Sequence, residues 1–201
     1  MYKILAIMGK AGSGKDSLMK ALIDGNYISG AKPIIGCTTR PIREYEVDGV
    51  NYHYLTNEEF AEQVLNGEML EATIFNEWCY GTSVKNLDEN VLNIGVFNPE
   101  AIEILKEVKN IDLTIVYIVA GDKTRLLRQL NREENPNCDE VVRRFGTDKI
   151  DFRWERIQNI NPNKMVQNDN GVAIDDLAKD IALWYDAPFP NGIPWVKINK
   201  E

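Results

Sequence analysis

The sequence has few of the residues that build disulfide frameworks or metal centres. It contains three cysteines and one histidine, and no two cysteines form a Cys-x-x-Cys pair. An odd number of widely spaced cysteines argues against a disulfide scaffold and a zinc site, and favours reduced thiols. The sequence also lacks an apolar run of membrane-spanning length and a signal-peptide pattern. We therefore expect a cytoplasmic protein with no membrane partner.

Positive charge is also scarce. The formal net charge is −8 over 201 residues, from 23 basic and 31 acidic side chains. This charge repels nucleic-acid polymers, so no nucleic-acid partner is expected and a phosphate-bearing ligand must meet a local basic cluster. Hydrophobic residues make up 44% of the chain, which is typical of a folded protein. Length and composition predict one domain with small-molecule ligands. They do not fix the oligomeric state, and we expect a monomer or a homodimer.

Short apolar runs alternate with helical patterns along most of the chain. This alternation is typical of βαβ units, which build a parallel sheet covered by helices. The predicted strands are residues 2–8, 91–97, 113–120 and 164–167, and the predicted helices are 16–23, 100–108, 123–130 and 175–185. The pattern predicts a three-layer α/β fold with a central parallel sheet.

Two segments differ in character from these units. Residues 36–84 contain short strand-like runs around one helical pattern, and we interpret them as an inserted subdomain that binds the substrate. Residues 125–144 are rich in arginine, and Asn135-Pro136-Asn137 breaks them into two helices, as expected of a mobile lid. We place the domain over residues 1–187, followed by a proline-rich tail at 188–201.

A glycine-rich loop follows the first predicted strand and opens the first predicted helix. Its sequence, Gly9-Lys10-Ala11-Gly12-Ser13-Gly14-Lys15, is a P-loop in the strand-loop-helix context that the motif requires. Its backbone N–H groups can converge on the β- and γ-phosphates of ATP, while Lys15 bridges their oxygens as a catalytic residue. The next position usually carries a hydroxyl for Mg²⁺ but holds Asp16, so we assign the metal to Ser17 and make Asp16 a helix cap or a water-mediated contact. The expected ATP-binding residues here are Gly9, Gly12, Ser13, Gly14, Lys15, Asp16 and Ser17.

Four further motifs follow the P-loop in order. They are Thr38-Thr39-Arg40-Pro41-Ile42-Arg43, Glu46-Val47-Asp48-Gly49-Val50-Asn51-Tyr52, Asn66-Gly67-Glu68-Met69-Leu70-Glu71 and Tyr80-Gly81-Thr82-Ser83. Together with the P-loop they resemble the guanylate kinase family, over about residues 2–185. The resemblance implies a P-loop kinase with a central parallel five-stranded sheet, a nucleoside monophosphate-binding insert at 36–84 and an arginine-rich lid at 125–144. It also implies phosphoryl transfer from ATP, with Mg²⁺, to GMP or dGMP.

The predicted acceptor site carries donors for a phosphate and an acceptor for a base. Arg40 and Arg43 supply forked donors for a dianionic phosphate, and the hydroxyls of Tyr52 and Tyr80 can donate to the same oxygens. Glu71 can accept from both N1–H and the exocyclic amine of guanine, a pattern that adenine does not offer. The choice of base is therefore expected to depend largely on Glu71.

Base recognition departs from the family at two positions. Thr82 is expected to donate to O6 of the base. However, a serine that helps hold the base in the family aligns with Gly36, and the family's Asp-x-Asp aligns with Val96-Phe97-Asn98, which leaves Asn98 as its only remnant. An amide at Asn98 donates as well as accepts, which would admit another nucleobase or a deoxynucleotide.

The predicted lid carries four arginines that resemble the lid of the guanylate kinase family: Arg128, Arg132, Arg143 and Arg144. Arg128 and Arg132 share one helical face, and a shift of one residue in the alignment exchanges Arg143 with Arg144. We assign catalytic roles to Arg128, Arg132 and Arg144, because phosphoryl transfer needs charge neutralisation more than covalent chemistry. The resemblance also places Asn168 at the base of ATP, although an ordinary Asn-Asp turn fits equally well.

Two other functions remain open at this point. One is a kinase for another nucleoside monophosphate or for a phosphorylated sugar, which the departures at Gly36 and Asn98 favour. The other is a guanylate kinase-like module that binds proteins and has lost catalysis. Such modules typically lose the P-loop, so the presence of Gly14 and Lys15 favours an enzyme.

Overall fold

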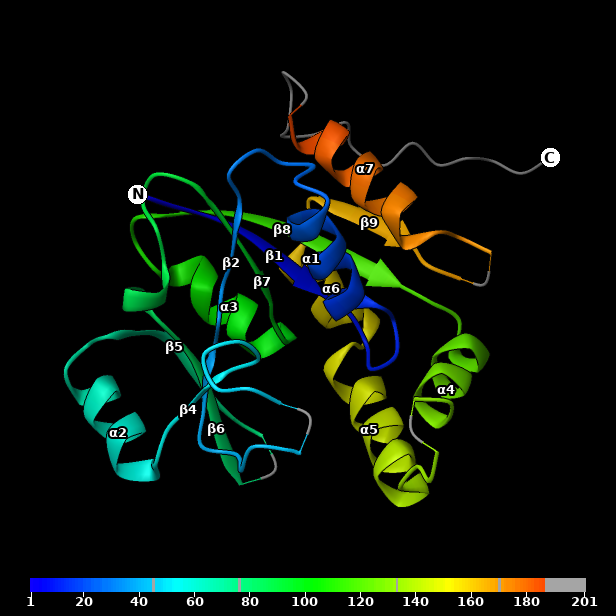
Figure 1. Ribbon diagram of the computed structural model, residues 1–201, viewed down its shortest axis with the longest axis horizontal. Helices are drawn as coiled ribbons and strands as arrows, with labels where there is room; N and C mark the ends of the chain where they lie inside the picture. Colours follow the sequence, from blue (N-terminus) through cyan, green and yellow to red (C-terminus); the bar gives the residue numbers. More distant parts are fainter. Residues whose placement is uncertain (45, 76, 133, 170, 187–201) are drawn as a thin grey trace.

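A five-stranded parallel sheet forms the centre of the computed structural model, which describes residues 1–44, 46–75, 77–132, 134–169 and 171–186 (Figure 1). In spatial order its strands are β2 (Lys32–Pro33), β7 (Leu92–Val96), β1 (Tyr2–Met8), β8 (Ile111–Val119) and β9 (Lys164–Gln167). This confirms the predicted α/β fold with a central five-stranded parallel sheet. The predicted tail at 188–201 lies outside the described residues.

Helices cover both faces of the central sheet. The helices on one face are α1 (Lys15–Asp24) and α7 (Ile174–Tyr185), and those on the other are α3 (Pro99–Glu107) and α6 (Trp154–Ile160). Residues of β1 point alternately to the two faces, so Leu5 and Ile7 pack with the first pair and Ile4 and Ala6 with the second. All four side chains are fully buried. A strand that is covered on both faces is apolar where it is buried, which explains the hydrophobic run from Ile4 to Met8 within the predicted strand.

Two elements of this core have no clear signal in the sequence. β2 consists of Lys32 and Pro33 alone, both exposed at the edge of the sheet, so no apolar run marks it. α6 has seven residues, fewer than the window over which a helical period can be recognised. Among the helices of the described ranges, none is both long and apolar enough to cross a membrane.

A second, four-stranded sheet lies between residues 37 and 83. Its strands are, in order, β4 (His53–Tyr54), β3 (Cys37–Thr38), β6 (Trp78–Ser83) and β5 (Met69–Phe75), and it is accompanied by α2 (Asn57–Leu65) and the short 3₁₀ turn η1 (Val84–Asn86). α2 begins in a capping box: the Thr56 hydroxyl accepts from the Glu59 N–H at 3.1 Å, and the Glu59 carboxylate accepts from the Thr56 N–H at 2.8 Å. Phe60 is 4% exposed and anchors α2 against this sheet.

The arginine-rich segment forms α4 (Asp122–Leu130) and α5 (Cys138–Asp151). Asn137 ends the predicted break and caps α5, because its side chain accepts from the Glu140 N–H at 3.0 Å. α5 continues well past residue 144, where the lid was expected to end. In Figure 1 the second sheet with α2, at lower left, and the pair α4 and α5, at lower right, extend from the same end of the central sheet.

Candidate active site

The P-loop joins β1 to α1 and depends on glycines in the left-handed region. Gly12 and Gly14 have φ angles of 75° and 95°. A Cβ at Gly12 would also lie 2.5 Å from the carbonyl oxygen of Arg125, so this position needs glycine for space as well as for conformation. Lys15 follows directly as the first residue of α1, where unpaired N–H groups and the helix dipole favour an anion.

Asn168 and Arg128 contact the backbone of the P-loop. Asn168 is 4% exposed, and its Nδ2 donates to the carbonyl oxygen of Ser13 at 2.8 Å. Arg128 donates to the carbonyl oxygen of Asn168 at 2.9 Å and lies 3.5 Å from those of Gly12 and Ser13. The amide nitrogen of Asn168 is therefore used to hold the loop. A contact between Asn168 and the base of ATP stays a prediction.

The first turn of α1 offers oxygen ligands at its surface. The Lys15 ammonium lies 3.6 Å from the carboxylate of Asp16, whose side chain is 78% exposed, and Ser17 is exposed beside it. Carboxylate and hydroxyl oxygens are ligands that Mg²⁺ accepts. No group of three or more His, Cys, Asp or Glu in the described part of the chain could hold a metal. The carboxylate of Asp16 and the hydroxyl of Ser17 suit Mg²⁺ that is bound by one or two protein oxygens together with substrate phosphates.

Glu46 organises the predicted phosphate site in the second sheet. Its two oxygens accept from Arg40 at 2.9 Å each, and one of them also accepts from the Tyr54 hydroxyl at 2.8 Å and the Arg43 N–H at 3.0 Å. Burial acts to raise the pKa of Glu46, but the hydrogen bonds from Arg43, Tyr54 and Arg40 together hold it below its ordinary value. Glu46 is therefore an ionised anchor for Arg40.

The two predicted phosphate-binding arginines differ in their freedom. The Arg40 side chain is 11% exposed and also donates to the Pro41 carbonyl oxygen at 2.8 Å. The Arg43 side chain is 38% exposed and lies 3.9 Å from Glu46. Arg43 is therefore the more accessible donor, whereas Arg40 is held in place.

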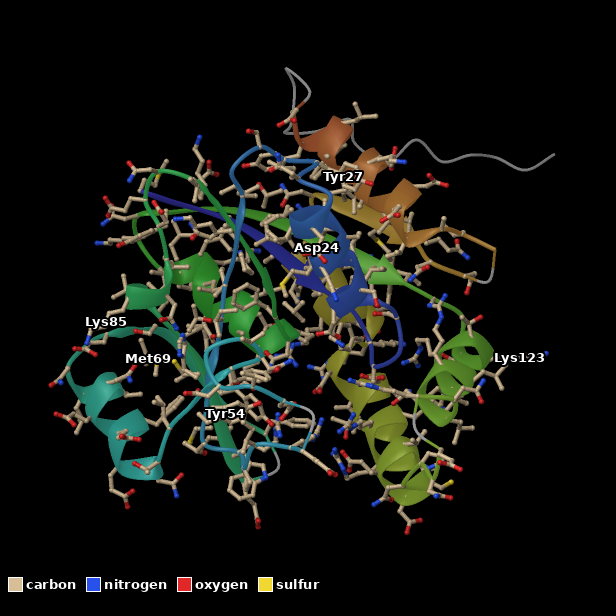
Figure 2. The ribbon with its side chains drawn as sticks, in the orientation of Figure 1. Asp24, Tyr27, Tyr54, Met69, Lys85 and Lys123 are labelled. Carbon is tan, nitrogen blue, oxygen red and sulfur yellow. The ribbon has the colours of Figure 1, made fainter. Side chains whose placement is uncertain are left out.

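Tyrosine rings surround the Arg40 guanidinium. Its central carbon lies 5.8 Å from the centroid of Tyr52 and 5.7 Å from that of Tyr54, and Tyr52 meets Tyr80 edge to face at 6.0 Å. Burial, with the charge of Asp16 next in size, raises the pKa of Tyr52 to about 12, so its phenol stays a donor. In Figure 2 the labelled Tyr54 lies on the second sheet, at lower left, and the labelled Lys123 lies on α4, at the right.

Glu71 is a buried carboxylate at the predicted base site. It is 6% exposed, and its Oε1 accepts from the Thr82 hydroxyl at 2.8 Å. Burial raises the pKa of Glu71 to about 7, opposed by the Thr82 hydrogen bond and assisted by the charge of Glu100. Sequence reasoning predicted that Thr82 donates to the base, whereas in the structure its hydroxyl proton is directed to Glu71.

The two departures from the family pattern both lie next to the second sheet. The Asn98 side chain caps α3 by accepting from the Ala101 N–H at 2.7 Å, which leaves its Nδ2 facing the Thr73 hydroxyl at 3.5 Å. Thr73 lies two residues after Glu71 in β5, and both are buried on the same face of that strand. A Cβ at Gly36 would meet the Gly81 carbonyl oxygen at 3.4 Å and the Tyr52 ring at 3.6 Å, so a larger residue has room there.

The arginines of α5 meet at Glu140, and one of them reaches the second sheet. Arg143 donates to Glu140 at 2.6 and 2.8 Å, and Arg144 donates to it at 2.6 Å. Only Arg143 of this pair contacts Phe75, at 5.2 Å between its guanidinium carbon and the ring centroid. Arg143 is thus the arginine of this pair that contacts the second sheet. The catalytic role of Arg144 stays a prediction, as does that of Arg132, which is exposed.

Comparison with known proteins assigns the family. The sequence profile of guanylate kinase matches residues 1–160. The chain belongs to the guanylate kinase family. It is 30% identical over 190 residues to the guanylate kinase of Sulfurimonas denitrificans, covering 92% of this chain and 87% of the relative. The guanylate kinase of Clostridium perfringens is 32% identical over 187 residues, covering 89% and 80%.

A solved guanylate kinase has the same fold. The crystal structure from Anaplasma phagocytophilum matches with a TM-score of 0.58 at 18% identity, covering 90% of this chain and 82% of that one. The two-sheet architecture of this guanylate kinase family member is therefore shared with a structure of low sequence identity.

Sequence reasoning missed several residues that organise the site of this guanylate kinase family member. Glu46 belongs to one of the motifs on which the resemblance rests. Its hydrogen bonds to Arg40, six residues earlier, follow no local pattern in the sequence. Arg125 and Asp148 form an ion pair at 2.7 Å next to the P-loop. They lie 23 residues apart on different helices. No short-range spacing could have paired them.

Proposed function

We propose that this protein transfers the γ-phosphoryl group of ATP to GMP or dGMP, giving ADP and the nucleoside diphosphate. The observation that carries the proposal is a P-loop in one chain with a second sheet that holds a buried carboxylate at Glu71 and an arginine, Arg40, fixed by Glu46. An ionised Glu71 pairs with N1–H and the exocyclic amine of guanine, and adenine would leave this buried charge without a partner. Family membership agrees with this substrate.

The proposed mechanism relies on placement and charge neutralisation. Arg43, with Arg40 held by Glu46, binds the acceptor phosphate, and the phenol of Tyr52 donates to it. An oxygen of that phosphate attacks the γ-phosphorus while the bond to the β–γ bridging oxygen breaks, and Lys15 neutralises the charge that develops. Mg²⁺ bound with ATP would be held by Ser17 and, directly or through water, by Asp16, and would supply further charge neutralisation.

We assign residues 36–84 to acceptor binding and residues 125–144 to a lid. The contact between Arg143 and Phe75 supports this division, because it joins α5 to the far end of β5. Closing the two segments over the nucleotides would exclude water and bring cationic groups to the transferred phosphoryl group. Cytoplasmic location and a monomeric or homodimeric state stay predictions from the sequence.

The deciding experiment measures ADP release with ATP and Mg²⁺ across all ribo- and deoxyribonucleoside monophosphates. Glu71→Ala is run beside the wild type, with Glu62→Ala, an exposed residue of α2, as the matched control. Turnover confined to GMP and dGMP, lost in Glu71→Ala and kept in the control, is expected. Turnover with none of these acceptors would reject the proposal and favour a binding module.

A second candidate is a kinase for a different acceptor. Asn98 favours it, because the capping bond to Ala101 fixes the amide oxygen and leaves only the donor nitrogen on the side of Thr73. A base that presents an acceptor there would suit this site better than one that presents a donor. Turnover with another nucleotide or with a phosphorylated sugar would establish this alternative and keep the assignment of the P-loop.

A further inference from the structure

An ion pair is buried at the base of the two lid helices, and the mechanism above makes no use of it. Arg125 of α4 is 1% exposed, and its Nη1 donates to Oδ2 of Asp148 of α5 at 2.7 Å. Asp148 is 8% exposed. Arg125 also donates through Nη2 to Asp122 at 3.0 Å. The pair therefore joins α4 to α5 away from solvent.

Both members of the pair bind the same residue of the P-loop. The backbone N–H of Ala11 donates to the Asp148 carboxylate at 3.0 and 3.3 Å, and the carbonyl oxygen of Ala11 accepts from Arg125 at 3.0 Å. The backbone of Arg125 in turn packs so closely on Gly12 that no side chain fits there. The two polar backbone groups of Ala11, at the start of the loop, are thus both held by the lid helices. In Figure 1 the loop after β1 lies next to α5, in agreement with these bonds.

Stability alone is a weak explanation for this arrangement. Removing two charges from water costs several kcal/mol per ion, and apolar replacements of similar volume are often neutral or stabilising. The pair between Arg156 and Glu103 offers a comparison, because it joins α6 to α3 with bonds of 2.7 and 2.8 Å but with side chains 21% and 42% exposed. An apolar pair could fill the space of Arg125 and Asp148, but it could not bind the N–H and carbonyl of Ala11.

We propose that Arg125 and Asp148 are positioning residues that hold the P-loop in the conformation that receives ATP and couple it to the lid. A loop whose backbone donors are already oriented binds phosphates without first having to be ordered, which strengthens binding and aligns the transferred group. The proposal rests on the kinase activity for its kinetic readout, whereas ATP binding tests it independently of the acceptor.

The test is the double variant Arg125→Met with Asp148→Leu, which removes both charges and keeps most of the volume. We expect Tm close to that of the wild type, while the affinity for ATP, measured by calorimetry without acceptor, falls about tenfold. In turnover assays the KM for ATP should rise and the KM for GMP should change little. The matched control, Arg156→Met with Glu103→Leu, should leave the affinity for ATP unchanged.

Wild-type ATP affinity in a double variant that keeps its Tm would overturn the proposal and make the pair purely structural. If the double variant does not fold, Asp148→Asn decides, because it preserves the shape but has one acceptor oxygen and no charge for Arg125. A weakened affinity for ATP in Asp148→Asn supports the proposal, and an unchanged one rejects it. If the wild type binds ATP but phosphorylates no acceptor, the proposed function fails while this comparison still stands.

Discussion

The ATP side and the acceptor side of this protein are organised in different ways. On the ATP side, the buried side chains of Arg125 and Asn168 bind the backbone of the P-loop directly. On the acceptor side, the Arg43 side chain is 38% exposed and that of Arg143 is 34% exposed. Glu71 is buried and accepts a hydrogen bond from Thr82, and burial raises its pKa to about 7. Buried side chains thus hold the backbone of the P-loop, whereas Arg43 and Arg143 are partly exposed.

The supporting structures explain this difference. The P-loop emerges from β1, which is buried between two layers of helices. The second sheet contains two strands of only two residues each, β3 and β4, and α2 contributes Phe60 as its single buried residue. A region with few buried apolar groups opens more easily than the main core, as the proposed closure of this segment on a substrate would require. Variants on one side should therefore change the properties of that side and leave those of the other side unchanged.

The largest effect is expected on the ATP side, from Lys15→Ala. The variant should bind GMP normally but lose about a hundredfold to a thousandfold in kcat, because the developing charge on the phosphates loses its preorganised cation. Steady-state ADP release measures this. Lys20→Ala changes an exposed lysine of the same helix and should behave as the wild type. Unchanged phosphoryl transfer in Lys15→Ala would contradict the assignment of the P-loop.

On the acceptor side, Glu71→Gln should raise the KM for GMP by at least about tenfold, because charge-assisted hydrogen bonds to the base are lost. The affinity for ATP should stay the same, since Glu71 makes no contact with the P-loop among its described hydrogen bonds. Calorimetry with each nucleotide separately checks both expectations. A parallel loss of ATP affinity would show that the two sides are not independent.

The pH dependence of the acceptor side follows from the same carboxylate. The pKa of Glu71 is raised from 4.5 to about 7, so the folded protein prefers its neutral form. Its contribution to stability is complete below about pH 4.5 and is lost as pH rises through about 7. Guanine needs the ionised form, so the KM for GMP should rise as pH falls below about 7. Glu71→Gln should flatten both profiles, and a wild-type GMP profile without a break near neutrality would refute this role.

A smaller effect is expected from Gly36→Ser, which restores the residue type that the family has at this position. The added Cβ would lie 3.4 Å from the Gly81 carbonyl oxygen, an ordinary contact, so the variant should fold normally. If the acceptor is GMP, its KM should fall a few-fold, which corresponds to the free energy of about one added hydrogen bond. Gly36→Ala provides the added volume without the hydroxyl. Equal behaviour of the two variants would count against a base contact here.

The smallest effect is expected from Thr56→Ala, which removes the cap of α2. The free energy of unfolding should fall by about 1 kcal/mol. The affinity for ATP should not change, because α2 belongs to the acceptor side. Thr56→Ser keeps the capping hydroxyl and should restore stability, as measured by urea unfolding. A change in ATP affinity would mean that the stability of the second sheet and the conformation of the P-loop are coupled.

The parts of the fold that rest on long regular patterns were predictable. The strands β1, β7 and β8 are mainly apolar because both faces of the sheet are covered. These three and the edge strand β9 were each placed within two residues of their observed limits. β2 was not located, because two exposed edge residues carry no pattern. Residues that belong to a motif, such as Lys15 and Glu71, could be named from the sequence, and their roles in binding and catalysis stay predictions. Their partners could not be named in this way.

The sequence by itself determined the P-loop and the sheet that carries it. An apolar strand, a glycine-rich loop and the start of a helix follow one another in the sequence, so a local pattern is enough to recognise them. Tertiary structure decided that Arg143 rather than Arg144 meets Phe75, that Asn168 supports the loop, and that Arg125 and Asp148 hold Ala11. These contacts join residues from separate elements, and only the packing of those elements brings their polar groups within bonding distance.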